Sequence, residues 1–118
     1  MTYQRFRDSF AEAMDPRLYG IEYLDRLLAT GAAHFFATDS AAIVTEFKIF
    51  PSGAKAVCGL IAAGEIEDIE TVLIPRAEAR GRMNGCTFGM IDSRPGWARR
   101  MKPHGYETWQ VSLIKELR

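Results

Sequence analysis

The sequence predicts an α+β domain in which helices flank a twisted, mostly antiparallel central sheet. Three observations favour this class: residues 2–31 carry apolar side chains at helical spacing, residues 33–63 change to the period of β-strands, and residues 65–117 alternate between helix and strand patterns. A chain of 118 residues can bury a core without a metal or a disulfide. We therefore expect residues 1–118 to form a single domain.

Two amphipathic helices are predicted at the N-terminus. The buried stripe of the first helix, over residues 2–14, is expected to comprise Tyr3, Phe6, Phe10 and Met14. Thr2 is the expected cap, and the Asp15-Pro16 step ends the helix. The second helix ends at Gly31, and its stripe consists of Ile21, Leu24, Leu27 and Leu28.

A three-stranded antiparallel meander is predicted next, over residues 33–39, 41–50 and 54–63. These segments are rich in β-branched and aromatic residues, and Thr-Asp-Ser and Pro-Ser-Gly turn sequences separate them. The third segment is apolar on both faces, which is typical of a strand in the middle of a sheet.

The remaining elements alternate. Residues 64–85 predict a helix with an acidic first turn, a bend or break at Pro75 and an Asn-Gly end. A short strand over residues 86–92, a short helix over 96–103 and a last strand over 106–117 are expected to follow. In the last segment Thr108, Gln110 and Ser112 alternate with Trp109, Val111 and Leu113. Strand, helix and strand after a meander predict a mixed sheet.

The overall charge does not indicate a class of binding partner, because 15 basic residues balance 15 acidic ones. The distribution is less even: residues 32–70 carry two Lys/Arg against six Asp/Glu, whereas residues 71–118 carry nine against four. Cys58 and Cys86 lie in apolar runs without a preceding secretory segment, so we expect reduced cysteines in a cytoplasmic protein. The cysteines and histidines lack the close spacing of metal ligands, so we expect no metal site. The sequence has no run of about 18 apolar residues, so we expect no membrane span.

The stretch IDSRPGWARRMKPHGYE, residues 91–107, allows two interpretations. Pro95 can set the first turn of a short helix that Gly105 ends, with Trp97 covering the sheet edge. Alternatively, a basic and aromatic surface binds an acidic protein, nucleic acid or a phosphate tail. This surface, called the basic face below, comprises Arg94, Trp97, Arg99, Arg100 and Lys102.

The order of these elements resembles that of the GNAT family of N-acetyltransferases, counted from the family's first helix onward. More narrowly, NGCTFGMIDSRPGWARRMKPHGY with the terminal KEL is similar to small GNAT-like proteins encoded in bacteriophage and prophage genomes. The likeness covers roughly residues 20–117, and its specific part is residues 84–106. It implies a GNAT-like fold and an acyl-CoA-dependent N-acetyltransferase activity.

The resemblance also implies a cofactor site. In GNAT enzymes the pyrophosphate of acetyl-CoA rests on backbone amides of a glycine-rich loop at a helix start. The matching segment here is AAGEIEDIE, with a single glycine and four acidic residues, so the motif is degenerate. The residues that correspond to the cofactor strand and loop are Leu60, Ile61, Ala62, Ala63 and Gly64.

The catalytic residues are less defined. Many GNAT enzymes place a tyrosine acid four residues before the closing Gly-Tyr, where this chain has Met101, which has no proton to donate. Glu46 is a candidate general base, and His104 and Tyr106 are candidate acids. Each also has a structural interpretation, as a strand-surface carboxylate, a loop histidine and a core-edge aromatic.

Three functions therefore stay open. The first is an N-acetyltransferase that binds acetyl-CoA. The second is an inactive GNAT descendant that serves a phage as an accessory or virion-associated protein and binds a macromolecule through the basic face. The third is a regulator whose basic face blocks the nucleic-acid contacts of a host protein. A homodimer through an open sheet edge is compatible with each, and the expected location is the cytoplasm of a bacterial host.

Overall fold

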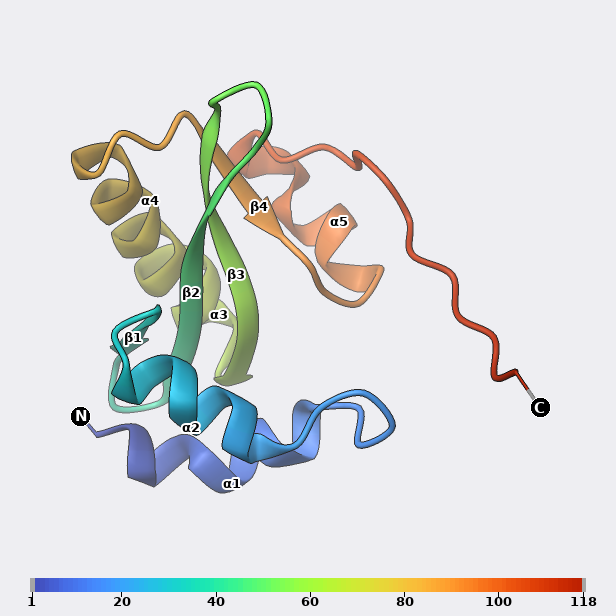
Figure 1. The fold of residues 1–118 in the computed structure, drawn as a ribbon. Coiled ribbons are helices and arrows are strands. Elements are labelled where there is room, and N and C mark those ends of the chain that lie inside the picture. Colours follow the sequence, from blue (N-terminus) through green and yellow to red (C-terminus); the bar gives the residue numbers. More distant parts are fainter. Residues whose placement is uncertain (1, 118) are drawn as a thin grey trace.

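The computed structural model describes residues 2–117, which form a mixed sheet with helices on both of its faces (Figure 1). The helical elements are α1 (Tyr3–Ala13), α2 (Ile21–Ala29), α3 (Ile66–Asp68), a π-helical turn (Ile69–Leu73), α4 (Ile74–Met83), α5 (Gly96–Met101) and a 3₁₀ turn (Lys102–His104). The strands are β1 (Ala33–Ala37), β2 (Ala41–Ile49), β3 (Lys55–Gly64) and β4 (Phe88–Ile91). The predicted α+β class is confirmed.

The strands lie in the order β1-β2-β3-β4. The first three form the expected antiparallel meander, and β4 pairs parallel to β3 after the helical crossover. β3 is a central strand, as its two apolar faces predicted. Opposite the step from Val44 to Thr45, the register of β3 jumps from Ile61 to Gly59, so Leu60 is an extra residue on β3.

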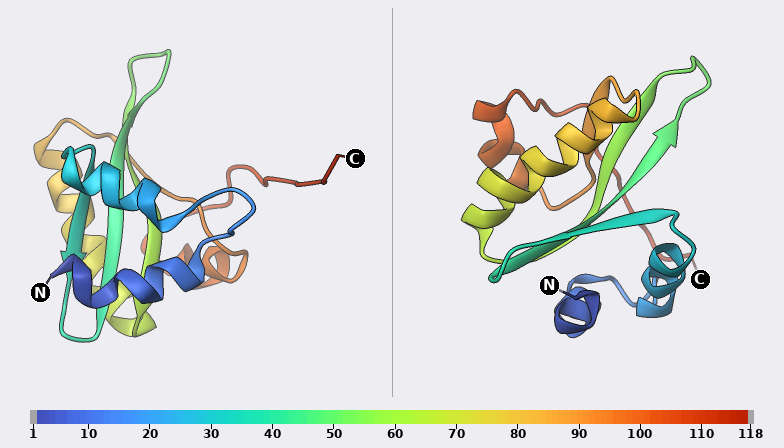
Figure 2. Two further views of the ribbon diagram at one scale, coloured as in Figure 1. Left: turned by 60° about the horizontal axis from the view of Figure 1, so that its bottom comes forward. Right: turned by 90° about the vertical axis from the view of Figure 1, so that its left-hand side faces the viewer.

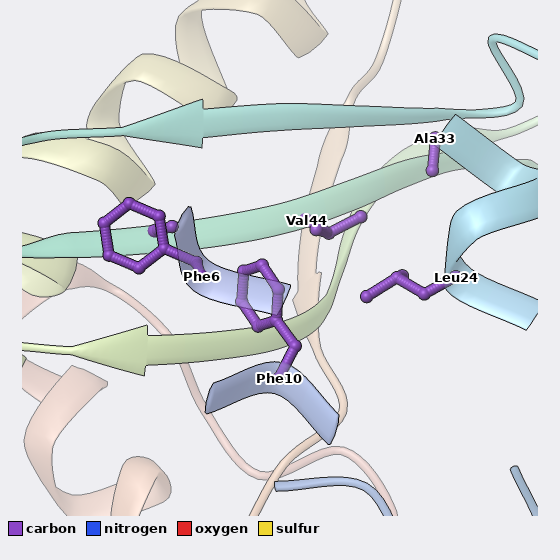
Figure 3. Packing of buried hydrophobic residues seen from close by; sticks show 6 residues of the cluster. Phe6, Phe10, Leu24, Ala33 and Val44 are labelled. Atoms are coloured by element: carbon purple, nitrogen blue, oxygen red, sulfur yellow. The ribbon is translucent and has the colours of Figure 1, made fainter. Parts of the chain in front are cut away.

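The two faces of the sheet carry separate apolar cores. On one face, α1 and α2 pack Phe6, Phe10 and Leu24 against β2, and Figure 3 shows these side chains around Val44. On the other face, Ile69 and Leu73 of the π-helical turn pack with Ala77 of α4 against Ile43 and Val57. Figure 2 shows α1 and α2 on the side of the sheet opposite α4 and α5. No described helix combines the length and the apolar content needed to cross a bilayer.

Pro75 distorts its helix as expected, although the form of the distortion is a wider turn and not a break. The π-helical turn Ile69–Leu73 comes directly before the proline, which lies in the first turn of α4. Proline cannot donate the usual backbone hydrogen bond, and a π-turn accommodates that loss without ending the helix. One local expectation is wrong: the Thr2 side chain makes no capping hydrogen bond to α1.

The predicted last strand is also wrong. Residues 107–117 have no regular secondary structure and all are exposed. Figures 1 and 2 show this segment, called the tail below, leaving the body beyond α5. Alternation of polar and apolar residues predicts which side chains share a face, but a strand also requires backbone partners. The tail has no such partner among the described residues.

An ion pair joins the two N-terminal helices and makes stability depend on pH. Arg7 Nη2 lies 2.7 Å from Asp25 Oδ2, and Tyr3 donates a 2.7 Å hydrogen bond to Asp25 Oδ1. These two partners, Arg7 first, lower the pKa of Asp25 below its ordinary value of 3.8. A lowered carboxyl pKa stabilises the fold above the unfolded-state value, and this contribution disappears as pH falls through the folded-state value.

We expect Asp25→Asn to lower the free energy of unfolding by a small amount at neutral pH and by nothing in strong acid. The effect is small because both side chains are about one-third exposed, at 30% and 33%. Urea denaturation of both proteins at the two pH values measures it. An equal difference at both values would contradict the pH linkage.

Candidate functional site

The sheet opens between β3 and β4. The two strands pair from Ala56 to Gly59 on β3, and the last contact is a 3.5 Å hydrogen bond from the Asp92 amide to the Gly59 carbonyl. Beyond that point β3 continues to Gly64 whereas the chain after β4 turns away to α5. A cleft of about 540 Å³, measured out to its open side, occupies the opening.

Apolar residues from β3, β4, α4 and α5 form most of the wall of this opening, called the cleft below. Its polar side chains are Thr45, Glu78, Asp92, Ser93 and Tyr106. Thr45 is 3% exposed and is the buried polar residue in the part of the chain that the structure describes. An apolar wall with a few polar groups is typical of a site that binds and orients an organic ligand.

Tyr106 and Glu78 form the polar centre of the cleft. The Tyr106 hydroxyl donates a 2.7 Å hydrogen bond to Glu78 Oε2 on α4. Burial, and then this hydrogen bond, raise the pKa of Tyr106 above its ordinary value of 10.0, so the hydroxyl keeps its proton at neutral pH. The phenol also lies against Gly89 of β4, where a Cβ atom would be 2.7 Å from the hydroxyl oxygen. Glycine at this strand position therefore leaves room for the ring.

The acidic residues of α3 and the π-helical turn are partly neutralised by other side chains of the protein. Glu70 Oε1 forms an ion pair with Arg100 Nε at 2.5 Å, and Glu70 Oε2 lies 2.9 Å from His104 Nε2. These contacts, led by His104, lower the pKa of Glu70. Asp68 accepts a 2.7 Å hydrogen bond from the Thr38 hydroxyl. Two of the four acids that follow Gly64 are thus occupied by contacts within the protein.

The three catalytic candidates do not come together. Tyr106 lies in the cleft, but His104 lies on Glu70 at the end of the 3₁₀ turn. Glu46 is opposite Ala33 on β1, a residue of the core under α1 and α2, so it is on the other face of the sheet. Its nearest cation is Lys48, at 4.0 Å. A dyad of Glu46 with Tyr106 is therefore excluded by the fold.

The cofactor candidates lie along the free half of β3. Leu60, Ile61 and Ala62 line the cleft, and Gly64 ends the strand. Gly64 has φ +98°, and a Cβ atom there would overlap the Ser40 carbonyl oxygen. The close approach of two backbone segments therefore explains this glycine without a ligand. Ala63 packs in the core under α1 and α2.

The basic face is only partly free. Arg94, Arg99 and Lys102 are exposed, and no ion pair within residues 2–117 reaches them. Arg100 instead pairs with Glu70. Trp97 is half-buried and packs against the core beside α4. Trp97 and Arg100 are therefore engaged by contacts within the protein.

Sequence reasoning missed Glu78 and Thr45. Glu78 belongs to a helix whose apolar stripe alone indicates the buried face, and Thr45 is one polar residue in an apolar strand. The isolated Gly89 inside a strand indicates a close approach, but it does not name the tyrosine that approaches.

Both cysteines are free, and burial raises the pKa of the Cys58 thiol to about 11. A buried thiol of this kind is unreactive.

Comparison with known proteins gives a likeness of structure and not of sequence. No family model matches the chain, and no curated protein matches it. An aminoglycoside antibiotic 6'-N-acetyltransferase from Acinetobacter haemolyticus superposes with a TM-score of 0.68 at 13% identity, over 99% of this chain and 95% of that chain.

Two further acetyltransferase structures are similar. A ribosomal-protein-alanine N-acetyltransferase from Brucella melitensis has a TM-score of 0.65 at 16% identity, over 96% of this chain and 92% of that one. A predicted acetyltransferase from Clostridium acetobutylicum, solved with acetyl-CoA, has a TM-score of 0.65 at 14% identity, over 95% of this chain and 84% of that one. At sequence identities this low, the structural likeness establishes the fold alone. This chain therefore has the GNAT-like α+β fold.

Proposed function

We propose that this protein transfers an acyl group from acyl-CoA to an amine. The observation that carries the proposal is the cleft, where the free edge of β3 faces the hydrogen-bonded pair of Tyr106 and Glu78. The GNAT-like fold supports it by analogy, and one structural neighbour was solved with acetyl-CoA. The acyl acceptor is an amine whose nitrogen can approach Glu78.

The residues of the cleft suit acetyl-CoA. Leu60, Ile61 and Ala62 offer a strand edge that β4 does not cover. The Ala62 side chain packs on the face of α4, whereas Leu60 and Ile61 also pack against the core under α1 and α2. An extended ligand that contains amides can pair with such an edge as an added strand would. Acetyl-CoA would supply the thioester, whose carbon gains a bond to the amine nitrogen as the bond to sulfur breaks.

The chain's own part is to move one proton. Glu78 accepts a proton from the attacking amine, and Tyr106 donates its hydroxyl proton to the departing sulfur. The protonated Glu78 then returns a proton to Tyr106 along the 2.7 Å hydrogen bond between them, so both residues end as they began. Because the pKa of Tyr106 is raised, its hydroxyl is protonated before each cycle.

Negative charge at the start of α3 is the main feature that opposes binding of the acetyl-CoA pyrophosphate. Glu65 and Glu67 are exposed there, close to where the resemblance puts the pyrophosphate. Glu70 is offset by Arg100, so the local charge is smaller than the sequence implies. Exposed carboxylates are also screened by salt over about 8 Å at physiological ionic strength.

We expect Ser93→Trp to weaken acetyl-CoA binding at least about tenfold, a loss of about 1.4 kcal/mol. Ser93 is exposed and lines the cleft, so an indole there fills the opening without entering the core. Calorimetric titration with acetyl-CoA measures the effect, and Ser9→Trp on the exposed side of α1 is the matched control. No binding by the wild-type protein, or equal binding by both variants, would overturn the proposed site.

A second candidate is a non-catalytic phage accessory protein that binds a macromolecule through the basic face. The free cations Arg94, Arg99 and Lys102 favour it. Binding to DNA or RNA that falls steeply with salt and is lost on Arg99→Glu would support this function. For either function we propose the cytoplasm of a bacterial host as the location, because a reducing compartment suits the two free cysteines.

A further inference from the structure

The start of α3 is unsuited to the nucleotide half of CoA. Diphosphates bind where the backbone amides at a helix start are free and where no negative charge lies close by. Here the Glu65 amide already donates a 3.0 Å hydrogen bond to the Ser40 carbonyl, and that carbonyl fills the space beside the Gly64 Cα. The Glu65 and Glu67 side chains are exposed at the same place. The chain therefore offers a diphosphate neither a free first amide nor a neutral surface.

The cleft itself suits the other half of CoA, the pantetheine arm that carries the thioester. Beyond Gly59 the edge of β3 is not covered by β4, and an extended ligand that contains amides can pair with it. Most of the cleft wall is apolar, which matches an arm that has no charge between its phosphate and its sulfur. The residues of this chain thus accept one half of CoA and oppose the other.

Free cations lie beside the open side of the cleft. Ser93 and Trp97 line both the cleft and a second groove between α5 and the start of the tail, and Arg94 lines that groove with them. Arg99 on α5 and Lys102 directly after it are also exposed. Within residues 2–117, no hydrogen bond or ion pair engages the side chains of Arg94, Arg99 and Lys102. Exposed cations beside a ligand entrance attract and orient an acidic partner.

The surroundings of these cations favour an acidic protein over a nucleic acid. Arg100 pairs with Glu70, which places α5 beside the acidic helix start. A nucleic acid carries charge at every phosphate, so a strand that continues past α5 would meet the exposed Glu65 and Glu67. Trp97 packs in the core and does not offer a free ring on which a base could stack. A folded acidic protein avoids both difficulties, because its carboxylates can be confined to the surface that it presents.

We propose that the acyl donor is a thioester on the phosphopantetheine arm of an acidic carrier protein. The carrier docks on Arg94, Arg99 and Lys102, and its arm enters the cleft between β3 and β4. A single phosphodiester joins the arm to the carrier, so no diphosphate has to lie at the start of α3. After transfer to the amine, the arm keeps the free thiol and leaves with the carrier. This inference rests on the acyl transfer proposed above and names its donor; acetyl-CoA, which has the same arm, is the weaker donor.

The small extent of the cationic surface suits a carrier that must leave after each transfer. Three cations within nine residues form a contact at the low end of protein interfaces, below about 1,200 Å², which is typical of transient encounters. Charge complementarity at such a contact mainly raises the rate of association. Fast docking and fast release are therefore both available to the carrier.

Binding tests the docking without any acyl acceptor. Calorimetric titration at low salt compares three ligands: acetyl-CoA, acetyl-pantetheine without phosphate, and a bacterial acyl carrier protein whose arm bears an acetyl group. The carrier should bind with a Kd at least about tenfold lower than that of acetyl-CoA. Its affinity should fall as salt is added, because exposed charges are screened, whereas the affinity of the uncharged acetyl-pantetheine should not.

A charge reversal tests the surface. Arg99→Glu should raise the Kd of the carrier at least about tenfold, since it places a like charge against the acidic partner. Arg26→Glu makes the same change at an exposed position of α2, on the opposite side of the sheet (Figure 2), and is the matched control that should leave carrier binding unchanged. Circular dichroism of both variants establishes that the body is folded.

The outcomes separate the donor from the reaction. If acetyl-pantetheine binds but the carrier binds no more tightly than acetyl-CoA, or if Arg99→Glu leaves carrier binding unchanged, the carrier proposal is overturned and the acyl transfer stands. Salt-sensitive binding of duplex DNA that is lost on Arg99→Glu, without binding of the carrier, would overturn it in favour of a nucleic-acid surface. No binding of any of the three ligands would overturn the proposed function together with its donor.

Discussion

Gly64→Ala should lower the free energy of unfolding by about 3 kcal/mol or more, the largest effect expected of any one-atom addition to this chain. Gly64 has φ +98°, and an added Cβ atom would overlap the Ser40 carbonyl oxygen and lie 2.7 Å from the Ala41 Cα. Both neighbours are backbone atoms, and the Glu65 amide donates a 3.0 Å hydrogen bond to the same carbonyl. Relief would require separating β2 from the end of β3. Chemical denaturation measures the loss.

Gly53→Ala is the matched control, because it separates the clash from the backbone strain. Gly53 also has a positive φ, at +89°, but a methyl group added there, in the turn between β2 and β3, would have no atom within 4 Å of it. Gly53→Ala should therefore lower the free energy of unfolding only by the cost of the left-handed conformation, about 1 to 2 kcal/mol. Equal losses for the two variants would mean that the contact with Ser40 is absent in solution.

The pair of glycine variants also bears on function. Gly64 is the one glycine where the resemblance implies a cofactor loop, and its structural role is sufficient to explain it. A variant at Gly64 that fails to bind acetyl-CoA would therefore say nothing about the cofactor site, since the strand end would be disturbed first. Ser93→Trp avoids this ambiguity because Ser93 is exposed.

Sequence patterns predicted the elements that depend on local chemistry and on burial. The two apolar faces of residues 54–63 placed β3 in the middle of the sheet, and the periodic Phe6 and Phe10 gave the buried face of α1. Pro75 indicated a distorted helix, and a π-turn is present beside it. In each case one physical requirement, burial or a missing amide donor, leaves few alternatives.

The tail shows where this reasoning stops. Trp109, Val111 and Leu113 have the spacing of a strand, but pairing depends on a neighbour that spacing does not provide. The positions of the candidate site residues likewise depend on tertiary packing. Glu46 is a polar residue on a strand, yet the face it occupies depends on its partner Ala33. Glu78 reaches Tyr106 across 28 positions of sequence, a contact that only the packing of α4 on the sheet creates.

Tyr106→Phe should lower the rate of acyl transfer about 100-fold while acetyl-CoA binding stays within about twofold. The phenyl ring can still pack against Gly89, so the substitution removes the hydroxyl proton and its 2.7 Å bond to Glu78 and little else. Release of free CoA thiol in the presence of a panel of amines and peptide N-termini measures the rate, and calorimetry measures binding.

Glu78→Gln tests the other end of the same proton path. The amide can still accept the Tyr106 hydrogen bond, but it cannot take a proton from the amine, so the rate should fall by a similar factor. The double variant should be no slower than either single variant, because residues that act on one proton in sequence are not additive. The raised pKa of Tyr106 also means that the wild-type rate should not fall near the ordinary tyrosine value of 10.0 through loss of the Tyr106 proton. Transfer that persists in Tyr106→Phe, or independent losses that multiply in the double variant, would assign the proton transfer to another group in the cleft.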